Sequence, residues 1–315
     1  MPSNRTIKSP TRRKPLKTMP MFIAAHEQHE ARLHNYQHIP RKRSELLSRS
    51  ELDELAPAGA TFLRSNNTAA RISFAHIASE HLTRFFETLG GDVPWSFVTL
   101  APKRFAIAES EAAKFDVGGL IAWTRDVLEG MHFVGMVEAA LYTNVGAHVG
   151  GADRVVSFHT HALVWGASPA DLAALVDSIN NSEPALIPGI PPGHQRSLKA
   201  REVRGPMIYM LKGPLSDHRV YPLRAAVTDQ ITGEITIETT GRFRQRKQAL
   251  RPRDAVRMFR VMSDRYIDRL AFAGGDGKTL LGMFRKEALK DWRRYQLRLN
   301  NCSGIDHDER AARDA

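Results

Sequence analysis

Apolar residues recur at helical spacing in several parts of the chain. Between residues 73 and 89 they fall at every third or fourth position, and the pattern stops at Gly90 and Gly91, as at the end of an amphipathic helix. Residues 114–129 show the same spacing, and Ser168 begins another helix as a favourable N-cap residue. Further helices are predicted over residues 206–212, 253–270 and 279–299.

Other stretches are short, aromatic and β-branched, which is typical of strands. Residues 94–100 form one of them, and residues 133–142 and 155–166 form two more that are separated by a glycine-rich segment. We expect the last two to pair as a hairpin with a long loop. Residues 221–240 alternate like a second hairpin with its turn at Thr232 and Gly233. The pattern therefore predicts an α+β fold with a central antiparallel sheet, flanking helices and helical extensions at both ends.

These patterns divide the chain into five consecutive regions. The first is rich in lysine, arginine and proline and has no acidic residue, so it cannot build a core and is predicted to be disordered. The regions are a basic tail over residues 1–22, a helical region over 23–91, the sheet-containing core with the second hairpin over 92–245, a basic helical region over 246–302 and a flexible tail over 303–315.

Composition narrows the class of protein. Of the 315 residues 42% are hydrophobic, which is enough for an ordinary globular core. No apolar run approaches the roughly 18 residues of a membrane-spanning helix, so no membrane partner is expected. A single cysteine excludes an internal disulfide framework and favours a cytoplasmic location. The net charge of +11 attracts polyanions, nucleic acid first and anionic membranes second.

A pair of histidines is the strongest chemical pattern in the chain. His159 and His161 lie two residues apart in a predicted strand, so both imidazoles point to one face of the sheet and can bind one divalent cation. In the predicted hairpin Glu138 falls opposite roughly residue 160 and adds a carboxylate to that face. A mixed set of this kind admits Mg²⁺, Mn²⁺ or Zn²⁺. The alternatives are a chance histidine pattern and a solvent-facing Glu138.

Tyr209 and Lys212 form a second pattern. Positions i and i+3 share one face of a helix, so the phenol and the ammonium are expected to lie together. A tyrosine has a pKa near 10 and needs a nearby cation to act as a nucleophile. Taken alone, Tyr209 is better explained as a core aromatic residue.

The order of these patterns resembles that of rolling-circle replication initiators of the HUH endonuclease superfamily, single-tyrosine type. The three matching segments are a β-branched strand ending in Phe97-Val98-Thr99-Leu100, then His159-Thr160-His161, then Tyr209 with Lys212. The resemblance covers about residues 93–215. This chain has Thr160 where the family has a bulky apolar residue, and no second tyrosine follows Tyr209 within a turn.

The resemblance implies a specific reaction. His159, His161 and Glu138 would hold a divalent metal, Mg²⁺ or Mn²⁺, that polarises a phosphate of single-stranded DNA or of an origin hairpin. Tyr209 would attack, leaving a 5′-phosphotyrosine and a 3′-hydroxyl that primes replication of a plasmid or phage, and Lys212 would stabilise the phosphate. Host replication proteins are possible partners.

A basic segment completes the expected DNA-binding surface. Residues 242–253 and the last predicted helix are expected to hold DNA phosphates beside the active site, and a solvated linker is the alternative for the first of them. The expected contacts are Arg242, Arg244, Arg246 and Lys247 in the segment, and Arg285, Lys286, Lys290, Arg293 and Arg294 in the helix. Other functions left open are a non-catalytic DNA-binding protein, an HUH transposase or relaxase, and an unrelated metal phosphoesterase with a water nucleophile.

Overall fold

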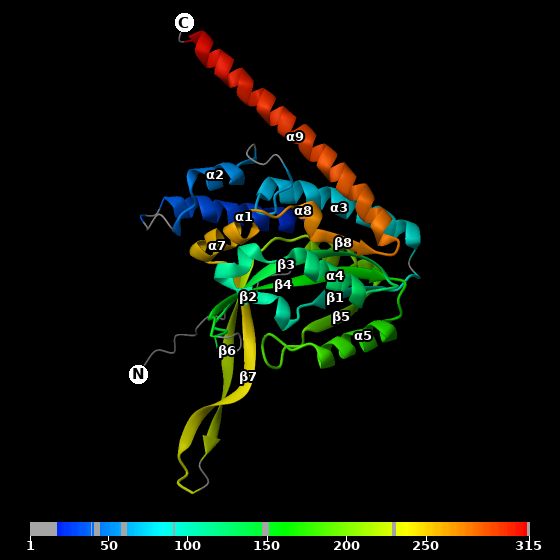
Figure 1. Cartoon of the computed structure of the whole chain (residues 1–315), viewed down its shortest axis with the longest axis vertical. Coiled ribbons are helices and arrows are strands. Elements are labelled where there is room, and N and C mark those ends of the chain that lie inside the picture. The colour runs from blue at the N-terminus through cyan, green and yellow to red at the C-terminus, as the bar shows by residue number, and fades with distance from the viewer. Residues whose placement is uncertain are drawn as a thin grey trace, which may run out of the picture.

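One sheet runs through the centre of the molecule (Figure 1). The computed structural model describes residues 18–38, 40, 45–57, 62–90, 92–146, 151–228 and 231–313. Within these residues eight strands pair in the order β5-β1-β4-β3-β6-β7, with β2 also on β4 and β8 also on β3. The strands are β1 (Trp95–Leu100), β2 (Ala106–Ala108), β3 (His132–Thr143), β4 (Arg154–Trp165), β5 (Gly193–Leu198), β6 (Ser216–Thr228), β7 (Ile235–Ala249) and β8 (Ala271–Gly274).

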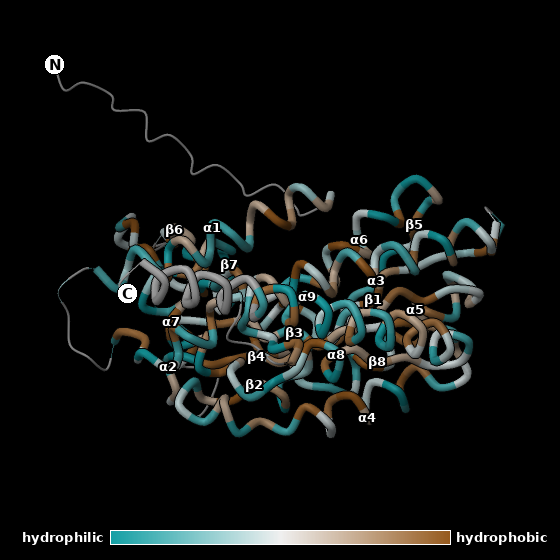
Figure 2. The backbone as a smooth tube through the Cα atoms, turned by 90° about the horizontal axis from the view of Figure 1, so that it is seen from above, coloured by the Kyte–Doolittle hydropathy of each residue, from teal (hydrophilic) through white to brown (hydrophobic). Residues whose placement is uncertain are grey.

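Helices flank the sheet, as an α+β fold requires. They are α1 (Met19–Gln37), α2 (Arg49–Leu55), α3 (Thr68–Leu89), α4 (Val117–Val127), α5 (Pro169–Ser182), α6 (Arg204–Met210), α7 (Pro252–Met262), α8 (Ile267–Leu270) and α9 (Gly277–Arg313). Viewed from above, hydrophobic segments lie in the middle of the body around β3, β4 and β8 (Figure 2). Among the described helices, none combines the length and the apolar character needed to cross a membrane.

The long hairpin of β3 and β4 is the centre of the sheet. The two strands pair antiparallel from His132 opposite Trp165 to Thr143 opposite Arg154, as the sequence predicted. The sheet is not antiparallel throughout, because β6 runs parallel to the end of β3 and places His218 beside Tyr142. That contact joins segments far apart in the chain, and no local pattern in the sequence indicates it.

The side chains of β4 show how the two faces of the sheet are covered. Thr160 points to the α4 side, where its hydroxyl lies 3.2 Å from the hydroxyl of Thr124. Trp165 points to the other side and packs edge-on against Phe85 of α3, with ring centroids 5.1 Å apart. A polar residue at position 160 is therefore explained by its partner on α4, where an apolar side chain would leave Thr124 with one contact fewer.

The remaining boundaries differ from the predictions in several places. The helix expected over residues 253–270 is divided into α7 and α8 by a turn, and α6 ends at Met210, two residues earlier than predicted. The backbone of residues 303–313 continues α9. Most of the predicted basic tail lies outside the described residues, and α1 begins within it, at Met19.

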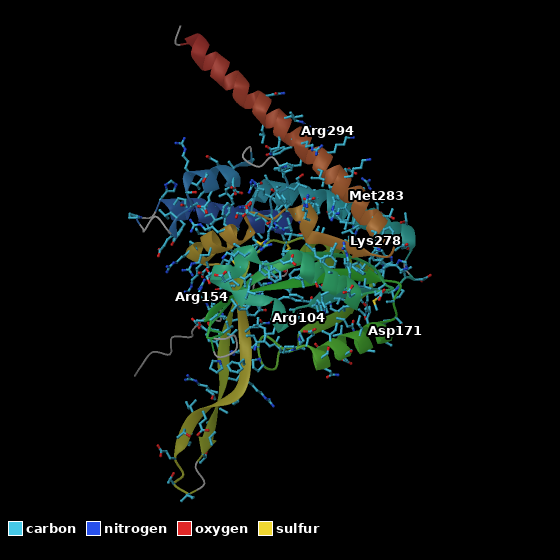
Figure 3. The ribbon with its side chains drawn as sticks, viewed as in Figure 1. Arg104, Arg154, Asp171, Lys278, Met283 and Arg294 are labelled. Atoms are coloured by element: carbon cyan, nitrogen blue, oxygen red, sulfur yellow. The ribbon has the colours of Figure 1, made fainter. Side chains whose placement is uncertain are left out.

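Two parts of the chain project from the body (Figure 1). At one end α9 extends beyond the other helices, and at the opposite end the distal half of the β6–β7 hairpin extends as a two-stranded arm. The arm has the predicted hairpin form, with Val227 opposite Thr236 near its tip. Side chains along it project into solvent, and Arg154 lies near its base (Figure 3).

Two buried polar side chains connect the N-terminal helices to the rest of the fold. His26 of α1 donates from Nδ1 to the carbonyl of Phe22 at 2.8 Å and accepts at Nε2 from the backbone N–H of Gly213 at 3.2 Å. Arg71 of α3 donates to the carbonyls of Ser65, at 2.7 Å from Nη2, and Leu211, at 3.1 Å from Nη1. Both side chains thus hold the segment that follows α6.

His26 makes the stability of the fold sensitive to acid. Burial, together with the charge of Arg71, lowers the pKa of His26 to about 3. In the unfolded chain an imidazole titrates near 6.5. The contribution of neutral His26 is therefore complete above pH 6.5 and is lost as the pH falls from 6.5 toward 3, because the unfolded state binds a proton that the folded state excludes.

We predict that His26→Gln weakens the pH dependence of the unfolding free energy. Between pH 6 and pH 4 the slope should fall by about 1.4 kcal/mol per pH unit, the value for one proton. Urea denaturation at several pH values measures it, with His194→Gln at an exposed position of β5 as the control. A slope equal to that of the parent chain would contradict the burial of a neutral imidazole at this position.

Candidate metal centre

The β3–β4 pairing brings the three predicted metal ligands together. Glu138 lies directly opposite His159, one residue from the position expected from the sequence, and His161 lies two residues further along β4. Alternate residues of a strand share a face, so all three side chains point to the α3 and α6 side of the sheet. The alternative from the sequence, a solvent-facing Glu138, is wrong, because only 5% of this residue is exposed.

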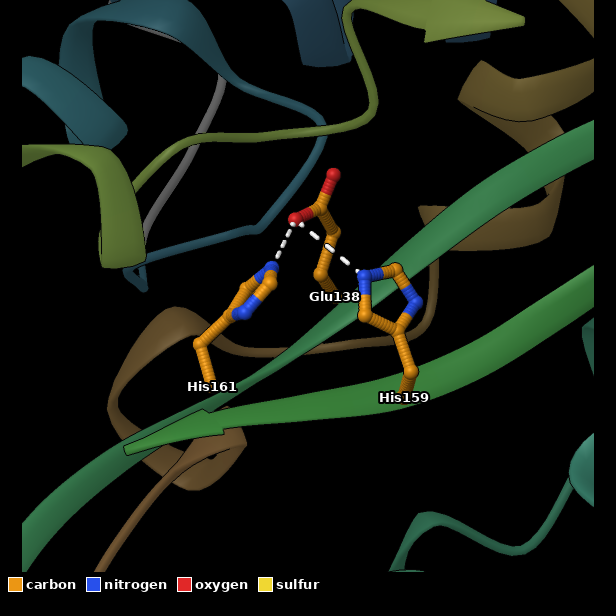
Figure 4. Close-up of side chains that lie close together, drawn as sticks. All are labelled: Glu138, His159 and His161. Atoms are coloured by element: carbon orange, nitrogen blue, oxygen red, sulfur yellow. Dashed lines mark hydrogen bonds and ion pairs between the residues drawn. The ribbon is translucent and has the colours of Figure 1, made fainter. Parts of the chain in front are cut away.

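The ligand atoms of this group converge on a single point (Figure 4). Nε2 of His161 lies 2.8 Å and Nε2 of His159 lies 3.4 Å from the same carboxylate oxygen, Oε2 of Glu138. One ligand atom from each residue lies within 4.8 Å of the other two, so the buried group could hold a metal ion. Three protein ligands are one fewer than the four of a closed structural zinc site.

Hydrogen bonds on the outer side of the imidazoles fix their orientation. Nδ1 of His159 donates to the carbonyl of Ser157 at 3.2 Å, so Nε2 presents its lone pair toward Glu138. Nδ1 of His161 lies 2.9 Å from the hydroxyl of Thr99 on β1. Such partners orient metal-binding histidines in known sites. Nε2 of His161 donates to the Glu138 carboxylate when the Thr99 hydroxyl donates to Nδ1, and offers its lone pair to a metal in the other tautomer.

Burial keeps both imidazoles neutral. It lowers the pKa of His159 to about 4 and the pKa of His161 well below its ordinary value. The neighbouring charge of Lys247 acts in the same direction on both. Neutral imidazoles are the form that binds metal, so the site is prepared for a cation at neutral pH.

Lys212 supplies a positive charge to this group. Its ammonium contacts Oε2 of Glu138, and only 4% of the residue is exposed. Burial, with the charges of Lys247 and Arg71, lowers the pKa of Lys212 well below its ordinary value. Lys212 is placed by its neighbours, since Arg71 binds the Leu211 carbonyl and His26 binds the Gly213 N–H.

The backbone at Gly213 approaches Arg71 closely. A Cβ atom there would lie 2.9 Å from Nε of Arg71, so a larger residue would displace the guanidinium. The close packing of Arg71 against the backbone therefore explains why a glycine follows Lys212.

Tyr209 of α6 lies against the same group. Its ring packs edge-on to His161 with centroids 5.4 Å apart, and the ammonium of Lys212 lies 3.9 Å from the centre of its ring. The ammonium of Lys247 donates to its hydroxyl at 3.1 Å. Burial raises the pKa of Tyr209. The predicted pairing of Tyr209 with Lys212 is therefore present, although Lys212 lies just beyond the end of the helix.

His218 and Tyr142 lie near the site, and the sequence did not indicate this position for either of them. The parallel contact between β3 and β6 stacks His218 on Tyr142 with ring centroids 4.7 Å apart. Burial, with the charges of Lys247 and His159, lowers the pKa of His218 to about 3, and its Nδ1 is a buried atom without a partner among the described residues. The one available signal was a histidine just before the predicted second hairpin, and it did not indicate which strand it would meet.

The basic segment of β7 has two different faces. Lys247 pairs with His218 across the β6–β7 ladder and points to the side of the metal-binding group. Arg246 pairs with Arg219 and Arg244 with Tyr221, so by the alternation along a strand they point to the opposite side. The segment that we predicted as one DNA-binding surface is thus divided, with only Lys247 at the site; Arg242 lies further along the arm.

Comparison with known proteins gives no family for this chain: no family model, no curated protein and no solved structure matches it.

Proposed function

We propose that this chain is a metal-dependent enzyme that nicks and rejoins single-stranded DNA by way of a 5′-phosphotyrosine on Tyr209. The observation that carries the proposal is the packing of Tyr209 against His161 of the buried Glu138, His159 and His161 group. A tyrosine, two lysines and a metal-binding group in contact supply the parts of a phosphoryl-transfer site. The resemblance of the three motifs to rolling-circle initiators and the charge of +11 support DNA as the substrate.

The metal would be held by Nε2 of His159, Nε2 of His161 and the carboxylate of Glu138. These donors fit a divalent ion, because the imidazoles are neutral and both Nε2 atoms lie beside the same carboxylate oxygen. Mixed nitrogen and oxygen ligands suit Mn²⁺, and Mg²⁺ remains a candidate through the carboxylate and substrate oxygens. When bound, the ion polarises the scissile phosphate and offsets its developing negative charge.

The lysines would prepare Tyr209 for attack. The Lys247 ammonium already donates to the Tyr209 hydroxyl, so it stabilises the phenolate that forms as the proton leaves. The Lys212 ammonium, which lies against the Tyr209 ring, would stabilise the charge of the phosphate.

The proposed reaction forms one bond and breaks one bond, and it needs no further reactant. The phenolate oxygen of Tyr209 forms a bond to phosphorus, the bond from phosphorus to the 3′-oxygen breaks, and that oxygen takes up a proton. The reverse reaction can rejoin the strand, because the bond between tyrosine and phosphate conserves the energy of the phosphoester bond that was broken.

We predict that Tyr209→Phe abolishes the covalent protein–DNA adduct. The substitution keeps the packing of the ring but removes the attacking oxygen, so adduct formation should fall by at least about 1,000-fold. Incubation with single-stranded DNA and Mn²⁺, followed by denaturing electrophoresis, measures the adduct. Tyr221→Phe on β6 is the matched control and should form it at the parental rate. Cleavage that persists without an adduct in Tyr209→Phe would instead indicate a water nucleophile.

A second prediction concerns the metal itself. His159→Ala and His161→Ala should each abolish the calorimetric binding of Mn²⁺, and Thr99→Val should weaken it by roughly 10-fold through the orientation of His161. His194→Ala, an exposed histidine of β5 that pairs with Thr99, should bind Mn²⁺ as the parent does. Unchanged binding in both alanine variants would mean that the histidine pair is structural.

The division of the basic segment gives a third prediction. Lys247→Gln should lower the rate of adduct formation while DNA affinity changes little, because this residue contacts Tyr209. Replacing Arg242, Arg244 and Arg246 by Gln should leave the rate on saturating DNA unchanged and reduce the salt dependence of binding by about 2 units of slope. Titrations at several salt concentrations separate the two effects. Equal loss of rate in both variants would contradict the division.

A further inference from the structure

A groove that the proposed reaction does not use lies at the β8 edge of the sheet, on the side that α4 covers. It has a volume of about 480 Å³, within the usual range for ligand sites. Its charged lining residues are Arg125 of α4, Asp268 and Arg269 of α8, and Arg285 of α9. The Glu138, His159 and His161 group points to the opposite face, so the two sites are separated by the sheet.

Positive charge exceeds negative charge inside this groove. Three guanidiniums line the groove with one carboxylate, so like charges outnumber the opposite charge there. Burial lowers the pKa of Arg285, Asp268 opposes this shift, and the charges of Arg125 and Arg269 add to it. An anion among the three arginines would remove the repulsion between them.

One buried hydrogen-bond donor in the groove also lacks an acceptor among the described residues. Arg285 is held in place, because its Nη2 donates to the carbonyl of Ala271 at 2.9 Å. Its Nε is buried and has no partner among the described residues. Arg125 and Arg269 are exposed, and neither has an ion pair within the described part of the chain. A buried donor without an acceptor is unfavourable, which points to an acceptor that binds from outside.

We propose that this groove binds a phosphate group. Guanidinium forks match the paired oxygens of phosphate and bind them more strongly than neutral donors do. The groove is open, so the phosphate would belong to a larger molecule, either the DNA backbone or a nucleotide. Exposed basic residues continue from Arg285 along α9 and favour the DNA backbone; Arg294 projects from this helix in Figure 3. They are Lys286, Lys290, Arg293 and Arg294.

This site extends the interaction with nucleic acid to the face away from the metal-binding group. DNA held there would be a double-stranded part of the substrate, since the strand to be cut must reach Tyr209 on the other face. The proposal does not depend on the nicking reaction, because three arginines would bind phosphate in a protein without catalytic activity as well.

The test uses the full chain with the double variant Arg125→Gln/Arg269→Gln. Both side chains are exposed, so the fold should be preserved, and circular dichroism checks this. The matched control is Arg49→Gln/Arg201→Gln, which removes two exposed arginines elsewhere. Affinity for a labelled DNA duplex is measured by fluorescence anisotropy over a range of salt concentrations, and stabilisation by dAMP or inorganic phosphate is measured by thermal denaturation. Adduct formation on a short single strand is recorded in parallel.

Two results would support the proposal and identify the source of the phosphate. A DNA backbone in the groove predicts that the duplex salt slope falls by about 2 in the double variant, from roughly 0.9 per phosphate, and stays unchanged in the control. A nucleotide predicts that dAMP raises the melting temperature of the parent and the control but not that of the double variant. Unchanged duplex affinity together with unchanged response to dAMP and phosphate would overturn it. Adduct formation should be retained in every case, which separates this outcome from a failure of the nicking proposal.

Discussion

The site depends on the burial of one carboxylate. Glu138 lies in the middle of the central hairpin, and a charged group in such a position is unfavourable unless opposite charge and hydrogen bonds surround it. The two imidazoles beside it add no positive charge, because burial keeps them neutral. A cation at this point would stabilise the carboxylate. The Lys212 ammonium does so in the structure, and a divalent metal can do so during the proposed reaction.

The N-terminal helices α1 and α3 help to position Lys212 without contacting it directly in the hydrogen bonds described. Arg71 and His26 hold the backbone on either side of Lys212, so the position of its ammonium is set by α1 and α3 as well as by α6. This gives the helical region before the sheet a role in the site, although no side chain from it contacts the metal-binding group among the interactions described. It also couples the acid sensitivity of His26 to the segment that carries Lys212.

Local patterns in the sequence predicted the central hairpin and the common face of His159 and His161, because strand alternation depends only on neighbouring residues. The partner of Glu138 was predicted one residue away, since loop length alone does not fix strand register. His218 could not be placed, because the parallel contact of β6 with β3 joins distant segments. Lys247 was grouped with three arginines that point elsewhere, since the orientation of β7 follows from that same contact. The groove between α4, α8 and α9 depends on tertiary packing alone.

The most direct test of this account is to identify the residue that becomes joined to DNA. After reaction with single-stranded DNA and Mn²⁺, the adduct is digested with nuclease and trypsin and analysed by tandem mass spectrometry. Cleavage after Arg204 and Lys212 releases a peptide of residues 205–212 that contains one tyrosine. The account predicts a nucleotide on Tyr209 of this peptide. A nucleotide on any other residue, or DNA that is cut without a covalent adduct, would contradict it.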